Sequence, residues 1–178
     1  MRIRNIILSL TLMVSCISCS KHRDGATEVQ ATNSDILTAI SRDWQLYMFV
    51  IGTDKDYYYV TGSELKNQSL YELSFKRTET YIASDNLWSG IYHFTTDSTQ
   101  LTLEPINPLQ LTCGLNIDNI SKTKMQFSTP WVEVNPEKAG ASNYEKFIVY
   151  QAITYLYNHN QDISKLRSVK LQLRYGSK

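Results

Sequence analysis

Short runs of alternating apolar and polar residues recur between residues 44 and 134, and they constrain the fold more than any other feature of the sequence. In the run YELSFKR, for example, Tyr71, Leu73 and Phe75 share one face. A period of two is typical of a strand that buries one side. Runs of this kind follow one another at intervals of roughly 8–15 residues, a spacing that favours either an antiparallel barrel or a β-sandwich.

Several segments have the alternation or the composition expected of strands. They are residues 44–52, 57–60, 70–77, 79–84, 90–94, 100–105, 109–117, 124–128, 131–134 and 168–175. Turn residues separate these segments. Asp97 lies in the DST turn of a hairpin over 90–105, and Pro105 and Pro108 interrupt the sheet after it.

A helical signal lies between the last two of these segments. Ser142 and Glu145 match the S-x-x-E capping box, and apolar residues follow at helical spacing as far as Tyr157. We therefore expect a helix over 143–158. Because KFIVYQAITYLY is also rich in β-branched and aromatic residues, a strand is the alternative for this segment.

The folding domain is expected to begin at residue 34 and to run to residue 178. In the segment 34–42, Ser34 can cap a short helix and Asp35 suits the positive end of its dipole. The preceding KHRDGATEVQATNS is polar, lacks aromatic residues and has no periodic apolar face, as is typical of a flexible tether. The roughly 145 remaining residues suffice for one domain with a sizeable core.

The first fifteen residues have the layout of a secretory signal. Arg2 and Arg4 supply the positive start, and the apolar stretch over 6–14 is too short to span a bilayer. The end of this stretch, LMVSC, resembles the lipobox of bacterial lipoproteins. In that family the cysteine thiol is alkylated with diacylglycerol and the signal is removed before it.

This resemblance implies that residues 1–15 are a lipoprotein signal peptide and that Cys16 is lipidated. Cys19 is the alternative site, because the residue before it, Ser18, is also small. Residues 16–33 would then be the tether between the lipid and the domain. The resemblance places the protein in the bacterial cell envelope, with the outer membrane as the expected location and the lipid as its membrane contact.

The order of the strands resembles the lipocalin-like domains of Bacteroidetes-type envelope lipoproteins. The motifs that carry the resemblance are Trp44 in DWQL, the hairpin GIYHFTTDSTQLTLEP and the hairpin LNIDNISKTKMQFS. The sequence departs from the family at Arg42, where a glycine is usual, and at 136–160, which looks like an insertion before the last strand. The resemblance implies an up-and-down antiparallel barrel with an apolar interior and no catalysis; a β-sandwich is the other fold considered.

No pattern of reactive side chains indicates an enzyme. His22, His93 and His159 have no metal-ligand spacing, and the sequence lacks the G-x-S-x-G nucleophile elbow. Cys113 is expected to be a free buried thiol, with a disulfide to a tether cysteine as the alternative. We therefore expect no metal, no cofactor and no catalytic residue.

The charge balance argues against a nucleic-acid partner. The whole chain has 18 basic and 17 acidic residues, and removal of Arg2 and Arg4 leaves 16 against 17, a formal charge of −1. Proteins that bind nucleic acids usually carry a basic cluster, which this sequence lacks.

Aromatic residues are the only candidates for a binding site. Tryptophan and phenylalanine side chains provide large apolar contact areas, and we expect a ligand to meet some of five such residues. They are Trp44, Phe75, Trp88, Phe94 and Trp131, all of which except Trp88 are also expected to lie in the interior. The expected role is binding of a small apolar ligand or a scaffold role. The alternative is an accessory interaction subunit of an envelope or surface assembly, built as a β-sandwich, with the insertion contacting a protein partner.

Overall fold

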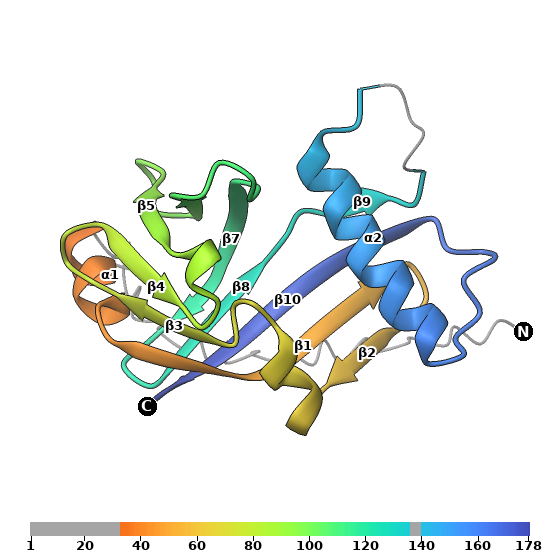
Figure 1. Ribbon diagram of the computed structural model, residues 1–178, viewed down its shortest axis with the longest axis horizontal. Coiled ribbons are helices and arrows are strands. Elements are labelled where there is room, and N and C mark those ends of the chain that lie inside the picture. Colours follow the sequence, from red (N-terminus) through yellow and green to blue (C-terminus); the bar gives the residue numbers. More distant parts are fainter. Residues whose placement is uncertain (1–32, 136–139) are drawn as a thin grey trace, which may run out of the picture. The chain divides into compact units, whose positions relative to one another are not determined.

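The computed structural model describes residues 33–135 and 140–178 (Figure 1). Residues 1–15, both lipidation candidates and the expected tether up to residue 32 lie outside this part. Within it are helices α1 (Asn33–Ile40) and α2 (Asn143–Asn158) and the 3-10 turns η1 (Gly62–Asn67) and η2 (Asn86–Trp88). The strands are β1 (Asp43–Thr53), β2 (Tyr57–Val60), β3 (Glu72–Phe75), β4 (Thr80–Ala83), β5 (Gly90–Phe94), β6 (Gln100–Pro105), β7 (Cys113–Ile120), β8 (Lys124–Ser128), β9 (Val132–Glu133) and β10 (Ser168–Ser177).

Eight of these strands form a closed antiparallel barrel. Strands β1, β3, β4, β5, β6, β7, β8 and β10 pair in this order, and β1 also pairs with β10. Each strand of the barrel therefore lies beside the next barrel strand of the chain, as in lipocalin-like barrels. Closure leaves no edge for a second packed sheet, so the barrel expectation is confirmed and the sandwich alternative is wrong.

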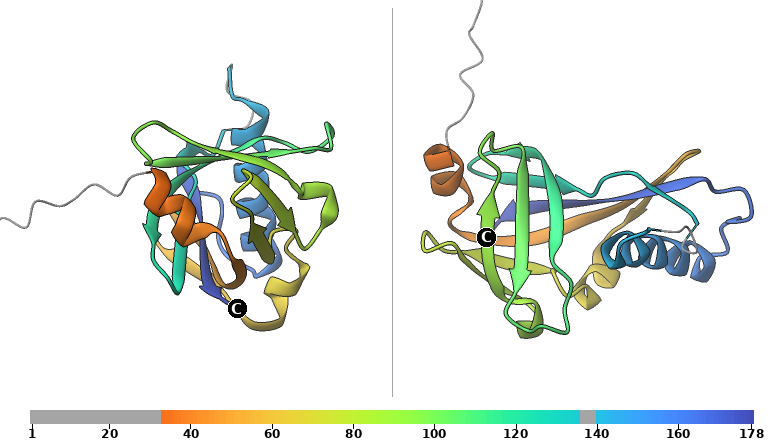
Figure 2. Two further views of the ribbon diagram at one scale, coloured as in Figure 1. Left: turned by 90° about the vertical axis from the view of Figure 1, so that its left-hand side faces the viewer. Right: turned by 90° about the horizontal axis from the view of Figure 1, so that it is seen from above.

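Strands β1 and β10 are longer than the other strands and continue past the barrel wall. Their register runs from the pair Trp44 and Ser177 to the pair Thr53 and Val169. Beyond the barrel, β2 joins the free edge of β1 and β9 joins the free edge of β10, and helix α2 packs against β9 and β10 (Figures 1 and 2). The barrel thus carries a four-stranded extension that is covered by α2.

A β-bulge in β1 keeps the core-facing residues of this strand on the same side before and after it. The register with β10 shifts between Leu46 and Met48. Leu46 is opposite Tyr175 and Phe49 is opposite Leu173 across this shift. The extra residue, Tyr47, faces outward with 46% of its surface exposed. Without the bulge, every side chain beyond it would change sides.

Aromatic side chains fill the end of the barrel that lies away from α2. Phe75 meets Tyr92 edge to face, with ring centroids 5.1 Å apart. Helix α1 lies at this end (Figure 2), where the indole Nε1 of Trp44 donates to the carbonyl oxygen of Ile40 over 2.8 Å. Trp44 and Ile40 are both fully buried. This half of the barrel is therefore a packed core.

The expected helix over 143–158 is confirmed at α2, with the same bounds. The side chain of Ser142 accepts from the backbone N–H of Glu145 over 3.1 Å, and the carboxylate of Glu145 accepts from the N–H of Ser142 over 2.7 Å. Both halves of the capping box are present. The strand alternative for this segment is wrong, because its buried residues follow helical periodicity.

The turn at Asp97 is also confirmed. Its carboxylate accepts hydrogen bonds from the hydroxyl groups of Thr95 and Thr99 and from the backbone N–H of Thr99. These bonds favour the ionised carboxylate and hold the pKa of Asp97 below its usual value, with the Thr95 hydroxyl as the main cause.

The strand expected over 109–117 begins four residues later, at Cys113. The side chain of Asn107 accepts from the N–H of Leu109 over 3.0 Å, and its carbonyl oxygen accepts from the N–H of Gln110 over 3.0 Å. This turn around Pro108 competes with strand pairing. Leu109 is consequently 87% exposed rather than part of the core.

Candidate functional site

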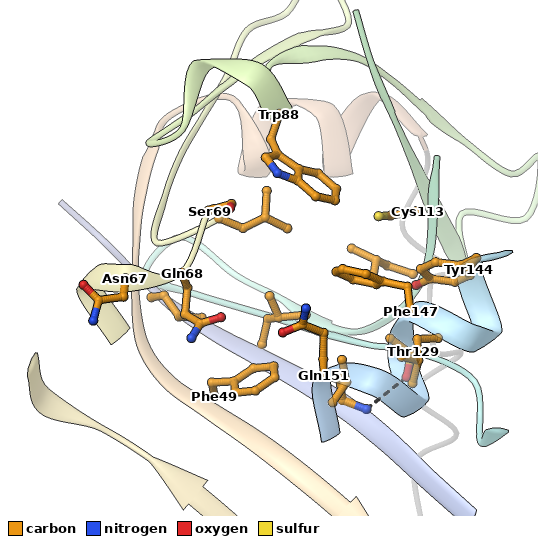
Figure 3. A pocket seen from close by; sticks show the side chains of 16 residues that line it. Phe49, Asn67, Gln68, Ser69, Trp88, Cys113, Thr129, Tyr144, Phe147 and Gln151 are labelled. Atoms are coloured by element: carbon orange, nitrogen blue, oxygen red, sulfur yellow. Dashed lines mark hydrogen bonds between the residues drawn. The ribbon is translucent and has the colours of Figure 1, made fainter. Parts of the chain in front are cut away.

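A cavity of about 380 Å³ lies at the α2 end of the barrel. We call it the mouth cavity. Its lining comes from the barrel strands β1, β7 and β10, from the segments η1 and η2, and from α2. Ten of the sixteen lining residues are apolar, and the polar ones are Asn67, Gln68, Ser69, Thr129, Tyr144 and Gln151 (Figure 3). The volume lies within the range of small-molecule sites.

Helix α2 provides one wall of the mouth cavity. Tyr144, Phe147, Ile148 and Gln151 are spaced by three or four residues, so they lie on one face of the helix. This face is directed into the barrel end. The hydroxyl of Tyr144 donates to the carbonyl oxygen of Gly114 over 2.8 Å and thereby ties the helix to β7.

An aromatic contact closes the cavity on the side opposite β1 and β10. The rings of Trp88, from η2, and Phe147, from α2, lie with centroids 6.0 Å apart. Asp85 positions η2, because its carboxylate accepts from the N–H of Leu87 over 3.0 Å. The contact joins an element of the barrel to an element of the insertion (Figure 3).

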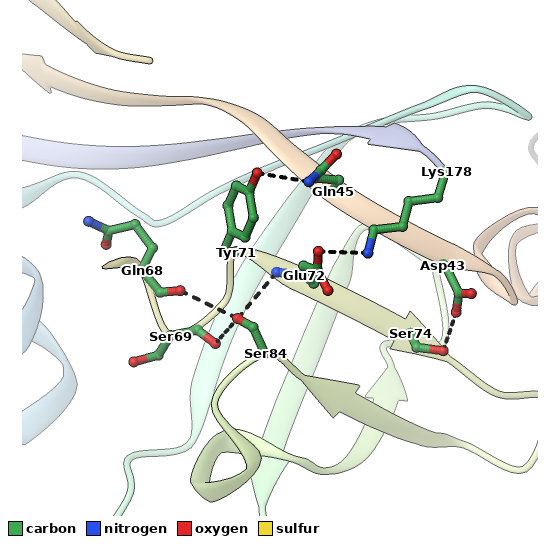
Figure 4. A network of polar contacts seen from close by, with 9 residues as sticks. All are labelled: Asp43, Gln45, Gln68, Ser69, Tyr71, Glu72, Ser74, Ser84 and Lys178. Atoms are coloured by element: carbon green, nitrogen blue, oxygen red, sulfur yellow. Dashed lines mark hydrogen bonds and ion pairs between the residues drawn. The ribbon is translucent and has the colours of Figure 1, made fainter. Parts of the chain in front are cut away.

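A polar network on the outside of the barrel fixes one rim of the cavity. The hydroxyl of Ser84 donates to the carbonyl oxygen of Ser69 over 2.9 Å and lies 3.4 Å from that of Gln68. The same hydroxyl accepts from the N–H of Glu72, whose carboxylate pairs with Lys178 over 2.7 Å (Figure 4). The backbone at Gln68 and Ser69 is therefore held by the hydroxyl of Ser84, which directly follows β4.

Cys113 lines the inner part of the cavity. Its thiol is free and buried, and burial raises its pKa from 9.0 to about 12. Free Cys113 matches the expectation from the sequence. A thiol with so high a pKa is a weak nucleophile at neutral pH, so this position contributes apolar surface.

The polar groups of the lining fall into two kinds. The hydroxyl of Thr129 accepts from the N–H of Leu171 over 2.9 Å and donates to the carbonyl oxygen of Pro130 over 3.0 Å, so it is satisfied within the protein. The side-chain amides of Asn67, Gln68 and Gln151, the hydroxyl of Ser69 and the indole N–H of Trp88 make no hydrogen bond in the part of the chain that the structure describes. These five groups are available to a ligand.

Of the five residues expected to meet a ligand, Trp88 lines the mouth cavity. Trp44 and Phe75 lie in the packed half of the barrel and are fully buried. Phe94 is partly buried and meets Tyr92 edge to face over 5.6 Å. Trp131 is 47% exposed, so the expectation that it lies in the interior is wrong.

The outward direction of Trp131 follows from the position of β9. Val132 is opposite Val169, and both side chains are buried in the core, so the residue before Val132 faces the opposite, exposed side. There the Nζ of Lys170 lies 5.5 Å from the indole centroid, a cation–π distance.

Four cavity residues that the sequence did not single out lie on α2. They include Phe147 and Gln151, which both fall within the helix expected over 143–158. Their three-to-four residue spacing indicates a shared face. Only the packing of α2 over the barrel end makes this face a cavity wall.

The remaining ionisable clusters are small and exposed. His93 lies 3.8 Å from Glu79, and His159 lies 3.6 Å from Glu64. Among residues 33–135 and 140–178, no three His, Cys, Asp or Glu side chains lie together as metal ligands would. Neither described helix has the length and apolar character required to cross a membrane.

Comparison with protein-family models, curated proteins and solved structures finds no significant match to the chain.

Proposed function

We propose that this chain is a non-enzymatic, lipid-anchored lipoprotein of the bacterial cell envelope, related to the lipocalin-like lipoproteins, that binds a small apolar ligand. The observation that supports ligand binding is the mouth cavity of about 380 Å³, with its mainly apolar lining. The proposed lipidation site is Cys16, or Cys19 as the alternative, and the support for it is the resemblance of LMVSC to a lipobox. An acylated protein of this kind would be held at the membrane surface by its lipid chains.

Extraction of bound molecules from the purified protein tests the proposed ligand binding. The full chain is isolated from membranes, washed in nanodiscs of defined lipid composition, and denatured to release bound molecules. A stoichiometric apolar molecule that is absent from empty nanodiscs supports the proposal. Replacing Phe49 by Trp would fill part of the cavity and should reduce its recovery. Recovery of no molecule from several preparations, together with no binding of added apolar probes, contradicts it.

Mass spectrometry of the intact protein and of its N-terminal peptide tests the proposed lipid anchor. A diacylglycerol-modified peptide that begins at Cys16 supports the first choice, and one that begins at Cys19 supports the alternative. An unmodified N-terminus on protein from the soluble fraction contradicts the anchored class. This outcome leaves the ligand proposal to be judged by extraction alone.

A second candidate function is that of an interaction subunit in an envelope assembly. The observation in its favour is the outer face of α2, where Tyr150 is 66% exposed and Tyr157 is 70% exposed. Exposed tyrosines one heptad apart can anchor a protein partner. Crosslinking in intact cells tests it: a specific adduct at Tyr150 that is lost when Tyr157 alone is replaced by serine supports this role, and recovery of the monomer alone opposes it.

A further inference from the structure

The mouth cavity is polar in places but carries no charge. None of the sixteen described residues that line it is acidic, basic or histidine. Among the described residues, its polar groups without a hydrogen bond are the amides of Asn67, Gln68 and Gln151, the hydroxyl of Ser69 and the indole N–H of Trp88. These groups donate or accept hydrogen bonds without adding charge.

We infer that the mouth cavity selects an uncharged amphiphile with an amide or hydroxyl head and rejects a carboxylate of the same length. This inference rests on the proposed ligand-binding function and specifies its ligand class. The head would lie between the two glutamine amides, and the apolar body would contact the inner lining around Cys113 and Leu173.

The positions of the two glutamines support this arrangement. Gln151 projects from α2 into the middle of the cavity, and Gln68 projects from the rim that Ser84 holds (Figure 3). Both side chains are partly exposed, whereas Cys113 and Leu171 on the inner side are buried. The polar groups thus face the open side of the cavity and the apolar groups its inner side, which matches the two ends of an amphiphile.

An amide or hydroxyl head satisfies these groups in both directions. Its oxygen can accept from a glutamine N–H or from the indole of Trp88, and its own N–H or O–H can donate to a glutamine carbonyl. A carboxylate can only accept, and it would enter the cavity without a cationic partner. Burial of an unpaired charge costs far more than burial of a hydrogen-bonded neutral group.

The volume limits the length of the ligand. A water-sized group occupies about 30 Å³ of liquid, so a cavity of about 380 Å³ holds about a dozen such groups. Decanamide and decanoate have this size and the same shape, and they differ in the charge of the head. They are therefore a matched pair of probes.

The test compares the two probes on the full chain in nanodiscs. Tritiated decanamide or decanoate is equilibrated with the protein at about pH 8, where a carboxyl with an ordinary pKa of about 4–5 is ionised. Empty nanodiscs subtract partitioning into the bilayer. We expect saturable binding of decanamide, with decanoate at least about tenfold weaker.

Two substitutions at Gln151 test the assignment of the head site. Gln151→Leu should weaken the binding of decanamide about three- to tenfold, the usual effect of one lost hydrogen bond. Gln151→Lys should reverse the preference between the two probes and strengthen the binding of decanoate about tenfold, because the lysine supplies the missing cation. Gln161→Lys is the matched control, because Gln161 is exposed and lies outside the cavity lining. Leu and Lys are good helix formers, and unchanged thermal melting verifies that α2 persists.

The outcomes separate this inference from the function on which it rests. Equal binding of the two probes would overturn the selectivity and leave the cavity as a ligand site. An unchanged preference in Gln151→Lys would overturn the assignment of the head to this residue. Binding of neither probe, combined with no ligand recovered on extraction, would contradict the proposed function itself.

Discussion

Three tyrosine hydroxyls inside the barrel differ in their hydrogen bonds. The hydroxyl of Tyr175 donates to the carbonyl oxygen of Leu70 over 2.9 Å, and that of Tyr92 donates to the carbonyl oxygen of Lys76 over 2.7 Å. The hydroxyl of Tyr81 is buried and has no partner among the described residues. Burial raises the pKa of Tyr81 and of Tyr175 above 10.0, so both remain protonated. Single residues of one type therefore contribute differently to stability.

Replacing these tyrosines by phenylalanine should have opposite consequences. Tyr175→Phe leaves the partly buried carbonyl of Leu70 without its donor and should lower the free energy of unfolding by about 1–2 kcal/mol. Tyr81→Phe removes a hydroxyl that has no partner and should change it by less than about 0.5 kcal/mol or raise it. Urea unfolding measures both. A loss for Tyr81→Phe as large as that for Tyr175→Phe would contradict this account.

The thiol of Cys113 should be nearly inert in the folded protein. A pKa of about 12 instead of 9.0 reduces its thiolate fraction at pH 8 by roughly a thousandfold. Alkylation with iodoacetamide, followed by peptide mass spectrometry, should modify this site at least a hundredfold more slowly in buffer than in denaturant.

The same pKa shift makes stability depend on pH at the alkaline side. The unfolded thiol loses its proton near pH 9.0, whereas the folded thiol keeps it up to about pH 12. The stability associated with this group is therefore complete below pH 9 and declines as the pH rises toward 12. Cys113→Ala should remove this part of the decline, and an unchanged alkaline profile would speak against burial as the cause.

At the scale of elements, α2 combines a local start signal with a role in the cavity wall. Its capping box orients the first turn, where Tyr144 contacts β7, and Phe147 in the second turn contacts η2. Strands β10 and β9 provide the surface beneath the helix. A substitution at the cap should therefore shift the position of α2 and so alter the cavity wall.

Removal of the cap measures this coupling. Ser142→Ala should lower the free energy of unfolding by about 1 kcal/mol, because the N–H of Glu145 loses its acceptor. It should also weaken ligand binding. Ser63→Ala is the control, since Ser63 is exposed and its side chain makes no hydrogen bond in the described chain. Equal unfolding midpoints for the two variants would contradict a stabilising cap.

Substitution of two glycines by alanine tests how closely β5 and β6 approach each other. A Cβ atom on Gly90 would lie 2.0 Å from the carbonyl oxygen of Glu104 and 2.8 Å from the Cα of Pro105, both backbone atoms. Gly90→Ala should therefore force β5 and β6 apart and cost about 3 kcal/mol or more. Gly114→Ala meets nothing within 4 Å and should stay within about 0.5 kcal/mol of the parent in the same thermal unfolding experiment. Comparable losses would disprove the close approach.

The whole molecule depends on the pairing of β1 with β10, which joins the two ends of the described chain. This pairing closes the barrel, carries the extension beneath α2 and places Leu46, Phe49, Leu171 and Leu173 along the cavity. The side of β1 away from β10 pairs with β3 and then with β2. Both long strands are thus bonded on two sides.

Hydrogen exchange should reveal this central position. Amides of β1 and β10 should exchange only with global unfolding, whereas β2 and β9, which are short and lie at the edges of the extension, should open locally. Peptide-resolved exchange measures the difference as slower deuterium uptake in β1 and β10 by about tenfold or more. Uptake in β10 at the rate of β9 would show that the closing pair opens independently.

The sequence by itself predicted the elements whose signals are local. Period-two alternation located nearly all strands, the Asp97 turn joined its hairpin, and the capping box placed α2 at its observed bounds. Side chains within a few residues of each other determine these features. The strand expected from residue 109 begins at Cys113, because the hydrogen bonds of Asn107, which are equally local, form a turn that competes with the alternation.

Closure and the cavity were decided only by the tertiary structure. Trp44 pairs with Ser177 across nearly the whole domain, and no local pattern distinguishes that register from the open arrangement of a sandwich. Trp88 was the single expected binding residue at the cavity, while Phe147 and Gln151 acquired their places when α2 packed over the barrel end. Periodicity predicts which residues share a face of a helix or strand. The surface against which that face packs depends on contacts between distant segments, and these contacts form only in the assembled fold.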